Sequence, residues 1–394
     1  MTEIEFKALA AQGYNRIPLV AETYADLDTP LAIYLKLAHS GPQGGKNSCL
    51  LESVVGGERF GRYSFIGLPA RNVIRARGTA TEVLRDDKVI ETHQGDPLAF
   101  ISQYQARFKV ALRPGMPRFA GGLAGYFGYD TVRHIEPKLG PATKPYPAGM
   151  GEGPPDILLL QVDELVIVDN LAGRIYLMVY ADPAAPEAFN RAQQRIKELR
   201  IRLRKPIEIP YSHSSVVTAE ERHFAKADYL AAVLRAKEYI AAGDIFQVVL
   251  SQRFSFELGA DPFDFYRVLR QVNPSPYMYF VRMPELSLAG SSPEPMVKLV
   301  DNRVISRPIA GTRRRGATEE EDRRLGAELR EHPKEIAEHV MLIDLARNDV
   351  GRVVEFGTEQ VDEMMVLERY SHVMHLTSQV SGELANGKTP IDVL

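Results

Sequence analysis

The stretch DILLLQVDELVIVD, residues 156–169, followed by RIYLMVYAD, residues 174–182, decides the fold class that we expect of this chain. Both are short apolar runs next to turn residues, a pattern that predicts β-strands. Working outward, similar runs bounded by Gly and Pro predict further strands at YSFIGL (63–68), NVIRARG (72–78), GGLAGYFGY (121–129), IFQVVLSQRFSF (245–256), PYMYFVR (276–282), LSLAGSSPEP (286–295) and RVISRPIAGT (303–312).

Helical patterns interrupt these strands at three places. Residues 186–205 have helical spacing with a strongly charged outer face, and residues 226–243 form a second pattern that ends at Gly243. The third covers residues 334–349. Because strands and helices do not alternate strictly, we predict an α+β fold with large antiparallel sheets packed against helices rather than a parallel βαβ sheet.

A change of composition predicts the domain organisation. Residues 206–225 contain two prolines, several Ser and Thr and no periodicity, so we predict a linker there. We therefore expect an N-terminal domain at residues 1–205 and a second domain at residues 226–394.

Length, charge and cysteine content exclude several classes of protein. The chain has 394 residues, of which 45% are hydrophobic and 25% charged, enough for two domains or one large one. A net charge of −3 gives no general attraction to nucleic acid or to an anionic membrane. No apolar run has the length of a membrane span and no signal peptide opens the chain, so we expect a cytoplasmic protein. The single cysteine, Cys49, excludes an internal disulfide and a Cys-rich metal site.

The helical segment KEIAEHVMLIDLARND, residues 334–349, carries two acidic residues on one face. Its apolar residues surround the helix axis, which predicts a helix buried on most sides. Glu335 and Glu338 lie one turn apart, and buried carboxylates need a partner. That partner is either a Mg²⁺ ion or an Arg or Lys from a neighbouring element, and the spacing leaves both open. His339 and Asp344 instead favour one solvated side.

Three more segments carry residues that chemistry could use. RPIAGTRRRG (307–316) suits binding of a carboxylate by backbone, hydroxyl and guanidinium groups, although a run of arginines is more often a solvated loop. AGSSPEP (289–295) could present Glu294 as a general acid. RYSHVMHLTSQVSGEL (369–384) holds His375 in an apolar run, where a lone histidine is more often a core residue than a catalytic one.

Together these segments identify a family. The chain resembles the chorismate-utilising enzymes, and among them most closely the anthranilate synthase component I family. The resemblance covers nearly the whole chain through LLES (50–53), GGERFGRYSFIG (56–67), GGLAGYFGYD (121–130), GDIFQVVLSQRF (243–254), NPSPYMYF (273–280), SSPEP (291–295), PIAGTRRRG (308–316), KEIAEHVMLIDLARNDVGRV (334–353) and RYSHVMHLTSQVSGEL (369–384). A series of long motifs in one order is far more specific than a single site pattern.

The resemblance implies a reaction and a metal. Ammonia adds to chorismate with loss of the ring hydroxyl, and elimination of pyruvate then leaves anthranilate, in the first step of tryptophan biosynthesis. By this resemblance Glu338 is a direct Mg²⁺ ligand. Glu335, a catalytic residue, lies beside the metal, which anchors the ring carboxylate of the substrate.

The resemblance also implies the residues around the substrate. His375 corresponds to the active-site histidine beside the ring, and Gly311 with Thr312 to a substrate-contacting pair. Glu294 corresponds to the residue that protonates the departing hydroxyl.

Two positions separate the possible reactions within the family. Relatives that add water carry a lysine base where this chain has Gln247, so the neutral amide favours ammonia as the nucleophile. Many aminodeoxychorismate synthases carry a lysine nucleophile where this chain has Ala310. Anthranilate synthase is therefore the better fit, with aminodeoxychorismate synthase component I as the alternative.

The LLES and NPSPYM segments resemble the pocket where tryptophan acts as a feedback inhibitor. An ordinary strand end is the alternative explanation of LLES, and we favour the regulatory pocket. The resemblance assigns five residues to the inhibitor, namely Glu52, Ser53, Pro276, Tyr277 and Met278.

The source of ammonia implies a partner. A glutaminase needs a Cys nucleophile and a His base, and Cys49 lies in no setting that suits a nucleophile. The chain is therefore not expected to hydrolyse glutamine itself. The resemblance implies a separate glutamine amidotransferase subunit, as in the family, with free ammonia as a substitute at high concentration.

The chain stops at Leu394, whereas relatives continue with further substrate-binding strands and another Mg²⁺ ligand. We expect either a fragment of a longer chain or a missing part supplied by another polypeptide, with very little turnover by the 394 residues alone. A third hypothesis is a non-catalytic tryptophan-binding protein, which would bind tryptophan but not chorismate.

Overall fold

The computed structural model describes residues 1–40, 44–54, 61–112, 115–117, 119–140, 153–207, 219–370 and 372–394. The chain divides into two compact units, a larger unit of residues 1–209 and 269–394 and a smaller unit of residues 210–268.

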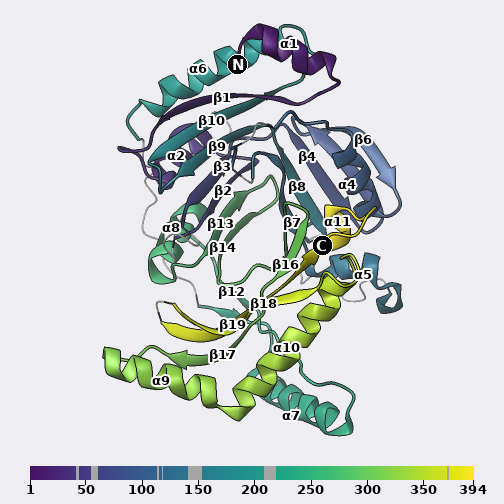
Figure 1. Ribbon diagram of the computed structural model, residues 1–394, viewed down its shortest axis with the longest axis vertical. Coiled ribbons are helices and arrows are strands. Elements are labelled where there is room, and N and C mark those ends of the chain that lie inside the picture. The colour runs from purple at the N-terminus through teal and green to yellow at the C-terminus, as the bar shows by residue number, and fades with distance from the viewer. Residues whose placement is uncertain are drawn as a thin grey trace. The chain divides into compact units, whose positions relative to one another are not determined.

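The largest sheet of the larger unit has seven strands, all paired antiparallel (Figure 1). In spatial order they are β1 (Ile17–Tyr24), β10 (Arg174–Ala181), β9 (Glu164–Asp169), β3 (Tyr63–Gly67), β2 (Ser48–Glu52), β13 (Tyr277–Arg282) and β14 (Ser287–Ser292). The strands predicted at residues 156–169 and 174–182 are thus confirmed.

A second antiparallel sheet explains why the opening stretch is so apolar. Its order is β6 (Lys88–Gln94), β5 (Ala80–Arg85), β4 (Asn72–Arg77), β8 (Ile157–Val162) and β7 (Gly122–Phe127). All six residues of β8 are buried. Leu158 and Leu160 pack with Leu165 and Ile167 of the seven-stranded sheet, while Leu159 on the other face packs with the helix α4 (Pro97–Ala106). A strand buried on both faces reads as a continuous apolar run.

The third sheet holds the motifs of the C-terminal third. Its strands are β15 (Lys298–Val300), β16 (Arg303–Ser306), β17 (Ile309–Arg314), β18 (Gln360–Arg369) and β19 (Val373–Glu383). The long strand β19 pairs with β16 and β17 along one edge and with β18 along the other, always antiparallel. Figure 1 shows α10 (Pro333–Gly351) running beside β17 and β19.

The other helical segments of the larger unit are mostly short. They are α1 (Glu3–Ala11), α2 (Pro30–Tyr34), the π-helical η1 (Leu35–His39), the 3₁₀ turns η2 (Tyr129–Thr131) and η3 (Pro137–Leu139), α5 (Val132–Ile135), α6 (Ala188–Leu203), α9 (Glu319–Glu331) and α11 (Pro390–Val393). The predicted charged helix at residues 186–205 is α6, which packs on β10 and β1. In the described residues no helix has the length and apolar character needed to cross a membrane.

The smaller unit contains α7 (Lys226–Ala242) and a two-stranded sheet of β11 (Glu221–Arg222) and β12 (Phe254–Ser255). Gly243 ends α7 in the left-handed conformation with φ +80°, as predicted. The strand predicted at residues 245–256 is wrong for most of its length, because only β12 is extended and paired. Helix α8 (Pro262–Val272) starts in this unit and ends in the larger one.

Strand pairing connects the two sides of the predicted linker. β13 follows residues 206–225 in the sequence, yet it pairs with β2, so Met278 lies opposite Glu52. Residues 208–218 of the predicted linker lie outside the described residues. The domain boundaries stay a prediction.

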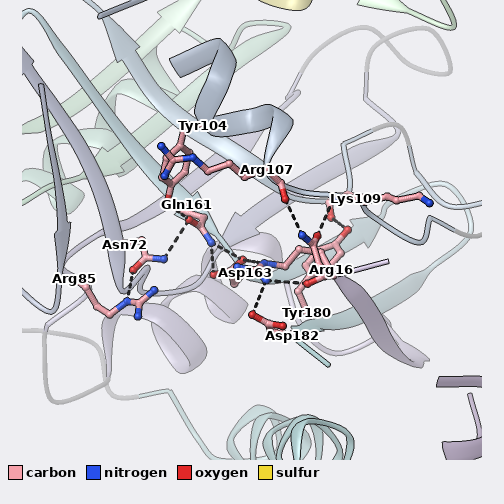
Figure 2. Close-up of polar contacts among 12 residues, drawn as sticks. Arg16, Asn72, Arg85, Tyr104, Arg107, Lys109, Gln161, Asp163, Tyr180 and Asp182 are labelled. Atoms are coloured by element: carbon pink, nitrogen blue, oxygen red, sulfur yellow. Dashed lines mark hydrogen bonds and ion pairs between the residues drawn. The ribbon is translucent and has the colours of Figure 1, made fainter. Parts of the chain in front are cut away.

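A buried polar network joins β4, β8 and α4 (Figure 2). The Oε1 atom of Gln161 accepts hydrogen bonds from Asn72 Nδ2 at 3.1 Å and from the Tyr104 hydroxyl at 2.6 Å. Its Nε2 atom donates to Asp163 at 2.8 Å, and Arg16 lies 3.9 Å from the same carboxylate. Every polar atom of the buried Gln161 amide group is thus partnered, as burial requires.

Candidate active site

His375 lies near the start of β19, opposite Thr312 of β17. Gly311 is an extra residue in β17 at this point, since the register shifts between Ala310 and Thr312, and its φ of +66° is the left-handed value typical of such a bulge. The Gly311 carbonyl oxygen is 2.9 Å from His375 Nδ1, and Thr312 Oγ1 is 3.1 Å from it. A carbonyl oxygen only accepts, so Nδ1 carries a hydrogen, and in a neutral imidazole the lone pair is then on Nε2.

The carboxylate of Glu294 is held by the first residue of β17. The backbone N–H of Ile309 donates to Glu294 Oε1 at 3.1 Å, and the N–H of Glu294 donates to Ser292 Oγ at 3.3 Å. Burial raises the pKa of the Glu294 carboxyl, and the Ile309 hydrogen bond only partly opposes this. A carboxyl with a raised pKa is suited to donate a proton.

Helix α10 is confirmed, but the prediction that it is buried on most sides is wrong. Val340 is 44% and Leu345 is 55% exposed. The buried residues form one stripe with helical spacing, His339, Ile343, Ala346 and Val350. The helix packs on a single sheet, so only the stripe that faces β16, β17 and β19 is covered.

The two acidic residues of α10 differ in their surroundings. Glu335 pairs with Arg313 of β17 at 3.3 Å, and Arg313 also pairs with Glu328 of α9 at 3.1 Å. Glu335 thus has an arginine neighbour, and the Mg²⁺ site stays a prediction. Glu338 is half-buried on the next turn. Gly311 lies against Glu335, since a Cβ atom at Gly311 would be 3.4 Å from Glu335 Oε2.

The donor set near α10 can be compared with what Mg²⁺ requires. Among the described residues, no three His, Cys, Asp or Glu side chains gather as a metal cluster. Mg²⁺ is commonly held by one or two carboxylates, with water and substrate oxygens completing the octahedron. Glu338, with Glu335 beside it, meets this smaller requirement.

The sheet separates His375 from the acidic helix. Successive residues of a strand point to opposite faces, so His375 and its neighbour Met374 face opposite ways. Arg313 lies opposite Met374 and pairs with Glu335, which places α10 on the Met374 face. The structure therefore brings His375 together with Thr312 and Gly311, whereas Glu335 lies on the other face of the sheet. The backbone of Gly311 lies between them.

The arginine run is engaged within the chain. Arg315 pairs with Asp322 at 2.7 Å, and this guanidinium holds the pKa of the Asp322 carboxyl well below its usual range. Arg313 is paired with Glu335 and Glu328. Arg313 and Arg315 are thus paired within the chain rather than free in a solvated loop, and the binding of a carboxylate by this segment stays a prediction.

The five residues assigned to an inhibitor lie around the pairing of β2 with β13. Glu52 is 5% exposed, and its carboxylate pairs with Arg270 of α8 at 3.1 Å. Ser53 Oγ is buried and has no hydrogen-bond partner among the described residues. The Tyr277 hydroxyl accepts from Lys298 Nζ at 2.5 Å, while Met278 is fully buried.

Sequence reasoning missed Arg270 and Arg313. Arg313 was seen only as part of a basic run, and Arg270 belongs to no motif that we used. Arg270 and Glu52 are 218 positions apart, so no local signal connects them. Gln247 lies exposed in the smaller unit, between α7 and β12, in backbone without regular secondary structure.

Comparison with known proteins places this fold and site in a class. The chain belongs to the chorismate-binding enzyme family, whose model matches residues 53–394. The predicted family and the α+β fold are thereby confirmed.

Relatives within this family share one name. The chain is 52% identical over 400 residues to anthranilate synthase component 1 of Pseudomonas putida, covering 100% of this chain and 79% of the relative. It is 49% identical to the protein of the same name from Neisseria meningitidis serogroup B, covering 99% and 78%. The crystal structure of anthranilate synthase component I from Streptococcus pneumoniae TIGR4 superimposes with a TM-score of 0.72 at 31% identity, covering 94% of this chain and 78% of that one.

Proposed function

We propose that this chain is component I of an anthranilate synthase, a lyase that converts chorismate and ammonia into anthranilate, pyruvate and water. The relatives named above support this reaction. The observation that carries it is the bulge at Gly311 of β17. The Gly311 carbonyl accepts a hydrogen bond from His375 of β19, and the first amide of β17 binds Glu294.

Two side chains of this site can move protons in the reaction. Glu294, whose pKa is raised by burial, donates a proton to the departing ring hydroxyl, which leaves as water. His375 Nε2 can accept a proton beside the ring while its Nδ1–H stays on the Gly311 carbonyl. Thr312, on the same face, can orient the substrate.

Mg²⁺ is the proposed cofactor. When bound it would supply a Lewis acid that anchors the ring carboxylate on the Glu335 side of the Gly311 backbone, while His375 and Thr312 contact the ring from the other side. Glu338 would hold the ion directly. Glu335, kept in place by Arg313, would lie beside it.

The nucleophile is proposed to be ammonia. Gln247 and Ala310 replace the lysines that relatives use for water addition or for a covalent adduct, which favours anthranilate synthase over aminodeoxychorismate synthase. The buried Cys49 has its pKa raised to about 11, so it makes a poor glutaminase nucleophile. We therefore propose a separate glutamine amidotransferase partner. A cytoplasmic location is a further part of the proposal.

Tryptophan is proposed as a feedback inhibitor bound by Glu52, Ser53, Pro276, Tyr277 and Met278. The Ser53 hydroxyl is buried and has no hydrogen-bond partner within the described part of the chain. This supports the proposal, because a buried hydroxyl is stabilised by a ligand that bonds to it.

The first test measures chorismate binding by calorimetry with and without Mg²⁺, together with the identity of any product. We expect Mg²⁺ to tighten chorismate binding, and Glu338→Gln to weaken the Mg²⁺-dependent part about tenfold or more, since a neutral amide is a poorer ligand. Any product formed from chorismate and ammonium is expected to be anthranilate with pyruvate.

Asp344→Asn is the matched control, because Asp344 lies on the same helix and is exposed. It should leave binding unchanged. Binding of chorismate that ignores Mg²⁺, or an aminodeoxychorismate product, would contradict the proposal. Binding of tryptophan without any binding of chorismate would favour a regulatory protein.

A further inference from the structure

His375 belongs to a row of side chains across three strands. On β17 it is opposite Thr312, and on β18 it is opposite Glu368. Directly opposite residues of antiparallel strands project from the same face. Thr312 contacts the Nδ1 side of the imidazole, and a different residue contacts the side that faces β18.

On the β18 side the neighbour of His375 is an aromatic ring. The rings of Tyr370 and His375 lie edge to face, with centroids 5.6 Å apart and planes at 62°. Such pairs prefer defined orientations and are worth roughly 0.5–1.5 kcal/mol beyond their buried area. The Nδ1–H bond to Gly311 leaves the imidazole free to tilt about that bond, and a second contact on the ring removes this freedom.

Tyr370 is itself held by Glu368. Its hydroxyl donates to Glu368 Oε2 at 2.9 Å, and Glu368 Oε1 accepts from the guanidinium of Arg307. Arg307 is 6% exposed and also lies 3.6 Å from Glu363. A buried guanidinium flanked by two carboxylates is costly to disrupt, so it anchors the whole arrangement.

The phenol of Tyr370 stays protonated in this setting. Burial, followed by the charge of Glu368, raises its pKa above the usual range. The hydroxyl therefore remains a donor to Glu368 throughout the pH range in which an enzyme assay is run.

We propose that Tyr370, held by Glu368 and the buried Arg307, is a positioning residue that fixes the orientation of the His375 imidazole. The inference rests on the proposed function, which assigns His375 to the reaction. None of the sequence motifs assigned a role to Tyr370, Glu368 or Arg307.

The test combines kinetics with NMR of protein labelled at the histidine ring nitrogens. Tyr370→Leu removes the aromatic ring, and we expect kcat to fall about 10- to 100-fold with KM for chorismate changed less than about threefold. Tyr370→Phe keeps the ring and loses only the hydroxyl, so kcat should fall less, by roughly two- to fivefold.

The NMR measurement does not need turnover. The Nδ1–H signal of His375, assigned by its absence in His375→Gln, should broaden or disappear in Tyr370→Leu and persist in Tyr370→Phe. Tyr24→Leu is the matched control for the substitution, since Tyr24 is 78% exposed on β1. Thermal denaturation identifies any variant that fails to fold.

The two proposals fail in different ways. If His375→Gln leaves turnover or chorismate binding unchanged, the role of His375 in the proposed function is wrong. If His375→Gln impairs the site while Tyr370→Leu folds with an unchanged His375 signal and unchanged kcat, Tyr370 does not position His375. A lower melting temperature of Tyr370→Leu with an unchanged signal shows a packing role only, and it also overturns the inference.

Discussion

At the scale of single residues, Gly311 is the position on which the site depends most. It adopts φ +66°, its carbonyl accepts from His375, and its missing side chain lets Glu335 approach. The resemblance of the PIAGT motif predicts that this glycine contacts the substrate. Its backbone conformation and its place between a helix and a histidine explain why a side chain is excluded there.

Gly311→Ala is therefore expected to lower both stability and chorismate binding. The left-handed conformation costs an alanine roughly 1–2 kcal/mol, and the added Cβ would lie 3.1 Å from Leu329 Cδ1. Urea denaturation and calorimetry measure the two effects. Gly243→Ala is the matched control, because Gly243 has φ +80° and open space around it, so it should show the backbone cost without a loss of binding. Equal binding by both variants would refute this role of Gly311.

Glu294 makes a prediction about pH. Its raised pKa keeps the carboxyl protonated to higher pH than an ordinary glutamic acid, and only the protonated form can donate. The rate should therefore fall as pH rises through this pKa, when the concentration of free NH₃ is held constant. Glu294→Gln should lower kcat by about 100-fold or more and abolish that limb of the profile. If the rate of the Glu294→Gln variant still falls as pH rises, another group is responsible for that fall.

At the scale of elements, α10 shows how packing selects one stripe of an apolar helix. The buried stripe includes His339, which is fully buried and lies 2.7 Å from Ser378 Oγ of β19. Burial lowers the pKa of His339 below its usual value. The helix thus docks on the sheet through a neutral imidazole.

This docking predicts that stability depends on pH. Below about pH 6.5 an unfolded histidine binds a proton that the folded His339 does not, so protons favour the unfolded state. The contribution is fully present above pH 6.5 and is lost as pH falls toward the lowered pKa of the folded state. In His339→Gln the melting temperature should fall less between pH 7 and pH 5 than in the wild type. His134→Gln, at a residue that is not fully buried, is the control and should retain the wild-type dependence.

At the scale of the whole chain, the larger unit is assembled from residues far apart in sequence. β13 pairs with β2, and Arg270 of α8 pairs with Glu52. The residues proposed to bind tryptophan, at the end of β2 and the start of β13, therefore come together only when both parts of the unit are folded. The hydrogen-bond network around Gln161 likewise connects three elements that are distant in sequence, β4, β8 and α4.

Gln161→Leu is expected to destabilise this unit more than removal of a single hydrogen bond. It leaves Asn72, Tyr104 and Asp163 without their shared partner, which costs roughly 2–4 kcal/mol, whereas Tyr104→Phe costs about 1 kcal/mol. Urea denaturation followed by circular dichroism compares the two. Gln193→Leu, on the exposed side of α6, should be neutral. A Gln161→Leu variant as stable as Gln193→Leu would show that the network adds nothing.

The sequence by itself determined most strands, the helices α7 and α10, the family, and the residues near His375. These depend on periodicity and on the residue sequence of the motifs, which are local features of the chain. Even so, the strand predicted at residues 245–256 is largely absent, because an apolar run becomes a strand only where another strand pairs with it.

Only the tertiary structure decided which partner each charged residue takes. The sequence allowed either a metal ion or an arginine as the partner of Glu335. The packing of α10 on β17 brings Arg313 within 3.3 Å of Glu335. The same docking placed Glu335 and His375 on opposite faces of a sheet, with Gly311 between them. The physical reason is that contacts between distant residues depend on strand register and helix packing, and no local pattern encodes these.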